Sequence, residues 1–90
     1  MFIITGGRGS GKTKKLLETA QENGGVIICR DPQKMIDRAH KYGMTGLDII
    51  SYEEYCTRKV IPNKPKYIHD LEAFMTDTFK DICGFSVCID

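Results

Sequence analysis

Residues 6–13 restrict the fold of this chain more than any other segment, because they join a short apolar run to an amphipathic stretch through four glycines. The eight residues are Gly6, Gly7, Arg8, Gly9, Ser10, Gly11, Lys12 and Thr13. They fit the pattern G-x-x-x-x-G-K-[S/T] at every fixed position. The run at 2–5 suits a buried strand, and the spacing after residue 11 suits a helix. The sequence therefore predicts a strand, a tight turn and a helix as its first unit.

The composition of this turn suits the binding of a phosphate chain. Glycines let the backbone approach a ligand closely, and backbone N–H groups that curl into a helix N-terminus offer many donors to negative charge. Lys12 is placed to reach the β- and γ-phosphates of a nucleotide, and the Thr13 hydroxyl is placed to bind Mg²⁺. For the Arg8 side chain, contact with a phosphate and exposure to solvent both stay open, and we favour solvent because Arg8 occupies a variable position of the pattern. We therefore expect residues 6–13 to form the nucleotide-binding segment.

Turn residues divide the rest of the chain into alternating strands and helices. Apolar runs predict strands at 26–29, 48–51, 66–69 or 66–70, and 85–89, and helical spacing predicts helices at about 11–23, 32–42, 52–59 and 71–83. Strands separated by single helices indicate crossover connections and a parallel sheet. The expected fold class is α/β, a three-layer α/β/α sandwich around a mostly parallel sheet of about five strands. We expect residues 1–90 to form a single domain.

Local signals predict where several helices begin and end. Asp31 followed by Pro32 is typical of an N-cap and a first helical residue, and Gly43 is well placed to end that helix. Ser51 and Glu54 have the spacing of a capping box. The buried helix faces are expected to consist of Leu16, Leu17 and Ala20, of Met35, Ile36, Ala39 and Tyr42, and of Leu71, Phe74, Met75, Thr78 and Ile82.

Charge and hydropathy limit the expected partners. A formal net charge of +1 gives no long-range field for nucleic acid or anionic membranes, so such a partner would need a local basic patch. Lys34, Arg38 and Lys41 form a basic stripe on one helix, but no aromatic residues are interleaved to stack on bases, so we expect a solvated surface. No apolar run approaches the roughly 18 residues of a spanning helix, and glycines follow the start too soon for a signal peptide. We expect a cytoplasmic protein without a membrane partner.

Other reactive side chains have structural interpretations. The cysteines form no C-x-x-C pair, so we expect reduced, metal-free structural thiols. They are Cys29, Cys56, Cys83 and Cys88. We expect His40 on a helix surface. Arg30 follows the second strand at the edge where such sheets bind ligands, which leaves both a nucleotide-side role and a surface role open.

The chain resembles the P-loop NTPases, because residues 6–13 match the Walker A element of that superfamily. The resemblance implies a second element, an apolar strand that ends in an acidic residue holding Mg²⁺ through water. Tyr67, Ile68, His69 and Asp70 match it best, although His69 stands where an apolar residue or an aspartate is usual. The apolar run 87–90 also ends in an aspartate, but no helix follows it, so we interpret it as the last strand of the sheet.

Two registers of this second element stay open. In the first, Asp70 orders the water shell of Mg²⁺ and Glu72 polarises the attacking water. In the second, His69 takes the metal-side position and Asp70 takes the activating role. We favour the first register because a hard cation prefers carboxylate oxygen to imidazole. A further interpretation, compatible with either register, is that Asp70 only caps the next helix.

The strands between the two elements are similar to the RecA-like, helicase and AAA+ side of the superfamily. No N-K-x-D motif occurs, which disfavours a GTPase of the common kind, and the chain looks like the small stand-alone ATPases of phages and mobile elements. The resemblance implies an ATP- and Mg²⁺-binding protein with slow ATP hydrolysis, to which a homo-oligomer or a protein partner supplies a catalytic arginine. Two alternatives are a nucleotide-binding switch or assembly subunit that does not hydrolyse, and a nucleic-acid motor subunit.

Overall fold

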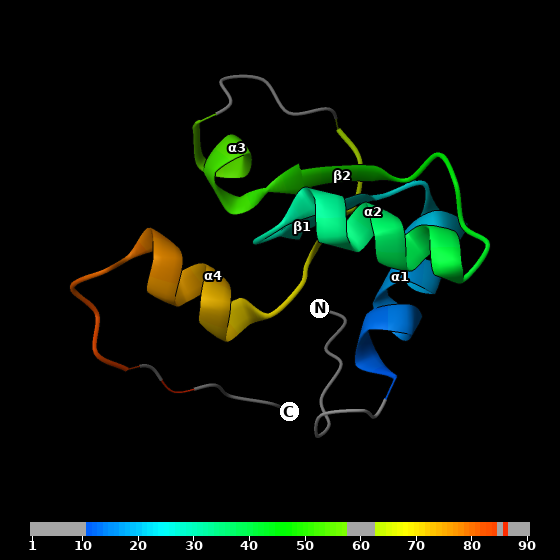
Figure 1. Cartoon of the computed structure of the whole chain (residues 1–90). Helices are drawn as coiled ribbons and strands as arrows, with labels where there is room; N and C mark the ends of the chain where they lie inside the picture. Colours follow the sequence, from blue (N-terminus) through cyan, green and yellow to red (C-terminus); the bar gives the residue numbers. More distant parts are fainter. Residues whose placement is uncertain (1–10, 58–62, 85, 87–90) are drawn as a thin grey trace.

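The computed structural model describes residues 11–57, 63–84 and 86, in which helices and strands alternate along the chain (Figure 1). In chain order the elements are α1 (Lys12–Asn23), β1 (Val26–Cys29), α2 (Pro32–Lys41), β2 (Asp48–Ser51), α3 (Tyr52–Thr57), β3 (Lys66–Ile68) and α4 (Leu71–Thr78). The strand expected at 2–5 lies outside the described residues, as do residues 85 and 87–89 of the expected last strand. The expected order of elements is therefore confirmed between residues 12 and 78.

The three strands form one parallel sheet in the order β2-β1-β3. β1 is central, with Val26 opposite Asp48 on one side and opposite Lys66 on the other. All four residues of β1 are buried, as expected for a parallel strand that is covered on both faces. The described part of the chain is thus a small mixed α/β fold around a three-stranded parallel sheet.

Two apolar clusters cover the opposite faces of this sheet. Because side chains alternate along a strand, Ile27 and Cys29 belong to one cluster and Val26 and Ile28 to the other. Helices α1 and α2 contribute to the first cluster, and α3 and α4 contribute to the second. The main helical members are Leu17, Ala20, Met35 and Ala39 on the first face and Tyr52 and Ala73 on the second. The apolar residues of the helices thus hold them against both sides of the sheet.

The turn from α1 into β1 needs its two glycines for different reasons. Gly24 ends α1 in the left-handed region, with a φ of 63°. A Cβ on Gly25 would lie 2.6 Å from Cε2 of Tyr67 and 2.8 Å from the carbonyl oxygen of Pro65. This close approach brings the start of β1 beside β3, where the N–H of Val26 donates to the Pro65 carbonyl at 2.8 Å.

The predicted starts of α2 and α3 are confirmed. The carboxylate of Asp31 accepts a hydrogen bond from the N–H of Lys34 at 3.2 Å. The Ser51 hydroxyl accepts from the N–H of Glu54 at 3.0 Å, and the Glu54 carboxylate accepts from the N–H of Ser51 at 3.3 Å, which is the capping box. Gly43, which follows the C-cap of α2, has a φ of 75°, as expected for a glycine that ends a helix.

The last helix begins at Leu71, as predicted, but it departs from its prediction at its C-terminal end and in its buried face. α4 ends at Thr78 rather than near residue 83, because Phe79 leaves the helical region with φ −121° and ψ 75°. Leu71 and Ile82, which were expected in the buried stripe, are each 47% exposed. The residue of α4 that is buried against the sheet is Ala73. Phe74, which was predicted in the stripe, is partly buried against the same cluster. The prediction missed Ala73 because it followed the large apolar side chains, whereas a small residue lies where the helix meets the sheet.

Smaller departures occur elsewhere. Tyr42, which was expected to be buried on α2, is 41% exposed, and the Nζ of Lys14 lies 5.6 Å from the centre of its ring. β3 ends at Ile68, so the two residues after it belong to the connection to α4. α3 ends at Thr57, and the proposed continuation to residue 59 lies outside the described residues.

The expectation of structural thiols holds for one of the described cysteines. Cys29 is buried in the sheet, where desolvation is the main cause that raises its pKa to about 11. Cys56 on α3 and Cys83 after the end of α4 are exposed, so neither is a buried structural thiol. Cys88 lies outside the described residues.

The helices in the ranges 11–57 and 63–84 are short. The longest is α1, with 12 residues, which spans only about 18 Å at 1.5 Å per residue. No helix in these ranges has the length and apolar character needed to cross a bilayer. The cytoplasmic location stays a prediction.

Candidate functional site

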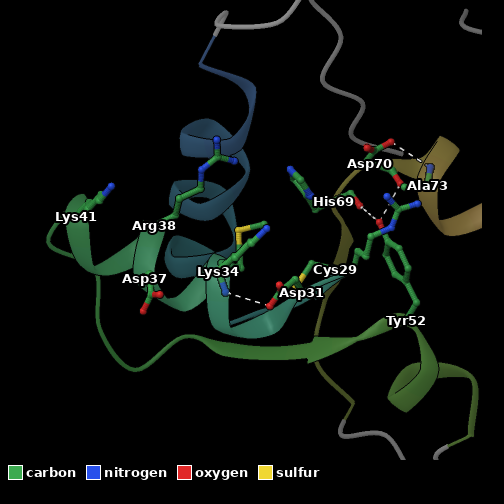
Figure 2. A pocket seen from close by; sticks show the side chains of 12 residues that line it. Cys29, Asp31, Lys34, Asp37, Arg38, Lys41, Tyr52, His69, Asp70 and Ala73 are labelled. Atoms are coloured by element: carbon green, nitrogen blue, oxygen red, sulfur yellow. Dashed lines mark hydrogen bonds between the residues drawn. The ribbon is translucent and has the colours of Figure 1, made fainter. Parts of the chain in front are cut away.

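The carboxyl ends of the strands open onto a cavity of about 540 Å³ (Figure 2). In parallel α/β sheets this is the edge at which ligands bind. Its walls are the residues that follow β1 and β3, the start of α3, and one side of α2. The polar residues among them include Arg30, Tyr52, His69 and Asp70 near the strand ends and Lys34, Arg38 and Lys41 on α2.

The last three residues of the glycine-rich segment form the start of α1, beside this cavity. Gly11 is the N-cap, with a φ of 78° that favours glycine, and it has no side chain to accept a helix N–H. Lys12 and Thr13 begin the helix and are partly buried. The first turn contains no acidic residue, so it offers no carboxylate of its own to the positive end of the helix dipole. The remaining site residues of the segment, Gly6, Gly7, Arg8, Gly9 and Ser10, lie outside the described residues.

Thr13 joins α1 to two other elements through its hydroxyl oxygen. The Nε2 atom of His69, just after β3, lies 3.2 Å from Thr13 Oγ1. Nη1 of Arg38 on α2 donates to the same oxygen at 3.2 Å. These partners are 56 and 25 residues away from Thr13 in the sequence. Of the two residues proposed for the metal-side position, His69 is therefore the one that contacts Thr13.

Burial lowers the pKa of His69, and the positive charges of Arg38 and Lys12 lower it further, whereas Asp70 opposes them. The imidazole is therefore neutral at pH 7, with one nitrogen free to accept a hydrogen bond. Since Arg38 already donates to the Thr13 oxygen, the single hydroxyl proton of Thr13 can be donated to Nε2 of His69. A neutral histidine thus faces the start of α1.

Asp70 caps α4, as one interpretation of the sequence predicted. Its Oδ1 accepts from the N–H of Ala73 at 3.1 Å, and its backbone adopts a left-handed φ of 60°. The backbone is fixed by the hydroxyl of Tyr52, which donates to the carbonyl oxygens of His69 at 2.5 Å and of Asp70 at 3.1 Å. Burial and the charge of Asp70 raise the pKa of Tyr52 to about 12, so this phenol stays protonated and able to donate. Figure 2 shows these bonds at one end of the cavity.

The other predicted residues occupy different places. Glu72 lies in the first turn of α4, where it is exposed and is not among the described residues that line the cavity. Arg30 lines the cavity but points its guanidinium at Asp77 of α4, with Nε to Oδ2 at 2.8 Å and Nη2 to Oδ1 at 2.9 Å. The hydrogen bond from Arg30 and its charge lower the pKa of Asp77. Arg30 thus fastens α4 to the end of β1.

The basic stripe of α2 was expected to be an ordinary solvated surface. Its three side chains are exposed, yet all three line the cavity, and Arg38 extends toward α1 (Figure 2). The signal in the sequence was the spacing of Lys34, Arg38 and Lys41, which places them on one side of the helix. The sequence did not indicate that this side of α2 lies next to the glycine-rich segment.

A Mg²⁺ ion next to Thr13 would need oxygen ligands from the surrounding side chains. No group of three or more potential metal-ligating His, Cys, Asp or Glu side chains occurs among the described residues. Mg²⁺ bound with a nucleotide keeps several waters and takes few protein ligands besides the phosphates, so such a group is not required. The Thr13 hydroxyl and the Asp70 carboxylate are suitable oxygen donors, whereas the imidazole of His69 is a poor ligand for this ion.

Comparison of the chain with protein-family models, curated proteins and solved structures gives no match.

Proposed function

We propose that this chain binds ATP together with Mg²⁺ and hydrolyses ATP slowly. The observation that carries the proposal is the start of α1, where Thr13, the last residue of a complete Walker A pattern, contacts two residues that line the cavity at the carboxyl edge of a parallel sheet. The proposal includes two further strands, at 2–5 and 85–89, which would extend the sheet to five strands in a three-layer sandwich. Thr13, which contacts two cavity residues, supports this location of the phosphates.

Each proposed role follows from the chemistry of the side chain. The N–H groups of residues 6–11 and the ammonium of Lys12 would meet the negative charge of the phosphates and of the transferred phosphoryl group. Thr13 and Asp70 would hold Mg²⁺, Asp70 through water, and the ion would offset the charge of the β- and γ-phosphates. Glu72 would orient the attacking water, although it is exposed and would have to turn toward the cavity.

A second candidate is a nucleotide-binding switch or assembly subunit that does not hydrolyse. The specific observation in its favour is that a neutral histidine, His69, faces Thr13 where a carboxylate is usual. The carboxylate of Asp70 is engaged in capping α4. Nε2 of His69 already faces the Thr13 hydroxyl, and Asp70 Oδ1 accepts from Ala73, so each group that could take a proton from water has another partner, which favours slow turnover or none.

The test uses the whole chain and two variants of α1. We expect the wild type to bind Mg-ATP in calorimetric titration and to release phosphate slowly, and we expect Lys12→Ala to lower phosphate release roughly 100-fold, as for loss of a group that stabilises transition-state charge. Lys15→Ala is the control, because Lys15 is exposed on the same helix and its substitution by alanine removes the same charge as Lys12→Ala. Binding without phosphate release would select the switch. No binding of Mg-ATP or Mg-GTP by the wild type would refute both.

A further inference from the structure

Arg38 occupies an unusual position for a surface arginine. Its guanidinium donates to Thr13 Oγ1, the atom that the proposed function assigns to Mg²⁺. The guanidinium of Arg38 therefore occupies the side of Thr13 Oγ1 that Mg²⁺ would need when the nucleotide binds. The guanidinium must then leave that oxygen, and a group that is always charged needs a new acceptor.

Asp31, Asp37 and Asp70 line the same cavity as Arg38, but no carboxylate of the described residues lies within 4 Å of its guanidinium. Among the described residues the one ion pair within 4 Å joins Arg30 to Asp77, so the nearby Arg30 is already engaged. Asp37, the neighbour of Arg38 on α2, accepts a hydrogen bond from Gln33 at 3.0 Å. The carboxylate of Asp31 caps α2. Asp70 caps α4, so each of the three carboxylates of the cavity lining has a partner other than Arg38.

The cavity itself favours an anion at this place. Lys34 and Lys41 lie on the same side of α2 as Arg38 and line the same space, and Lys12 on α1 is near enough for its charge to lower the pKa of His69. Positive groups on two helices therefore converge on the region next to Thr13.

We propose that Arg38 binds the terminal phosphate of the nucleoside triphosphate and that this contact lets the protein distinguish a triphosphate from a diphosphate. The inference rests on the proposed function. The γ-phosphate lies next to the metal in such sites, within reach of a side chain that already touches the metal-binding hydroxyl. The planar fork of donors of a guanidinium fits phosphate oxygens, which a lysine ammonium matches less well.

The experiment compares a non-hydrolysable Mg-ATP analogue with Mg-ADP by calorimetric titration of the full chain. We expect Arg38→Ala to weaken the affinity for the triphosphate by roughly 10- to 100-fold, the range for a lost hydrogen bond to a charged group, and to change the affinity for Mg-ADP by less than about 2-fold. Arg38→Lys should give an intermediate loss. Lys15→Ala, with the same loss of charge on the exposed side of α1, should change neither affinity.

The outcomes separate this inference from the proposed function. Arg38 is exposed on a helix, where alanine is the most favourable residue, so the variant should melt within a few degrees of the wild type. If the wild type binds the triphosphate but Arg38→Ala binds it equally well, the inference fails while the proposed function stands. Equal losses for triphosphate and diphosphate would also refute it. A wild type that binds neither nucleotide would refute both.

Discussion

Asp70 has two proposed roles, and two substitutions separate them. In Asp70→Asn the side chain keeps an oxygen that can accept from the N–H of Ala73, and asparagine tolerates the left-handed φ of 60°. In Asp70→Ala the cap is lost, and an alanine must adopt that backbone conformation. Asp70→Asn therefore removes only the charge, whereas Asp70→Ala removes both the charge and the cap.

The magnitudes follow from the geometry at the start of α4. Loss of an N-cap costs about 1 kcal/mol, and an ordinary residue in the left-handed region costs about 1 to 2 kcal/mol, so Asp70→Ala should lose about 2 to 3 kcal/mol of unfolding free energy. For a chain of this size that lowers the melting temperature by roughly 10 °C or more. Asp70→Asn loses only the interaction of the charge with the helix dipole, about 0.3 to 1 kcal/mol.

Thermal melts and Mg²⁺-dependent nucleotide titrations should be run on both variants. If Asp70 orders the water shell of the metal, Asp70→Asn should melt close to the wild type but bind Mg-ATP roughly 10- to 100-fold more weakly, the usual cost of losing an outer-shell ligand. If Asp70→Asn binds Mg-ATP as the wild type does, the metal role is wrong and the first register with it. If Asp70→Ala melts like the wild type, the argument from the cap and the φ angle is wrong.

Two further predictions test the packing. Gly25→Ala should lose about 1 to 3 kcal/mol, measured by urea unfolding, because its Cβ would lie 2.6 Å from the ring of Tyr67; unchanged stability would contradict this close approach. At pH 8 the thiol of Cys29 should react with iodoacetamide roughly 100-fold more slowly than a thiol of pKa 9.0, because its pKa is raised to about 11, whereas the exposed Cys56 should react without unfolding. Because the Cys29 pKa is higher in the fold, this thiol should contribute stability below pH 9.0 and lose it between pH 9.0 and about 11. A Cys29 that reacts as fast as Cys56 would contradict its burial.

Much of the fold could be predicted because its signals are local. The capping box joins Ser51 to Glu54, and Asp31 accepts from the N–H of Lys34 three residues later. Each signal and its structural consequence therefore lie within one helical turn. The continuous burial of β1 follows from an uninterrupted apolar run. Ala73 shows where such reasoning failed, because how closely α4 approaches the sheet depends on the partner surface as well as on the helix.

The candidate site could be predicted only in its first part. The glycine-rich segment is recognisable by itself, but its contacts join residues 25 and 56 positions apart. They depend on β1 lying between β2 and β3, an order that periodicity does not specify. Arg30 illustrates the same limit: its place at the strand end was predictable, but its partner Asp77 is 47 residues away.

The polar contacts at the carboxyl edge differ in how easily a ligand could replace them. The hydroxyl of Tyr52 is bonded to the carbonyl oxygens of His69 and Asp70, and Arg30 makes two hydrogen bonds to Asp77 of α4. None of these bonds involves the hydroxyl of Thr13. Thr13 is held by single contacts of 3.2 Å, and release of one such bond costs about 0.5 to 1.5 kcal/mol. A nucleotide at 100 times its dissociation constant would add about 2.7 kcal/mol to the stability of the state that binds it. Ligand binding can therefore displace Arg38 from Thr13 while the contacts that hold the cavity together remain.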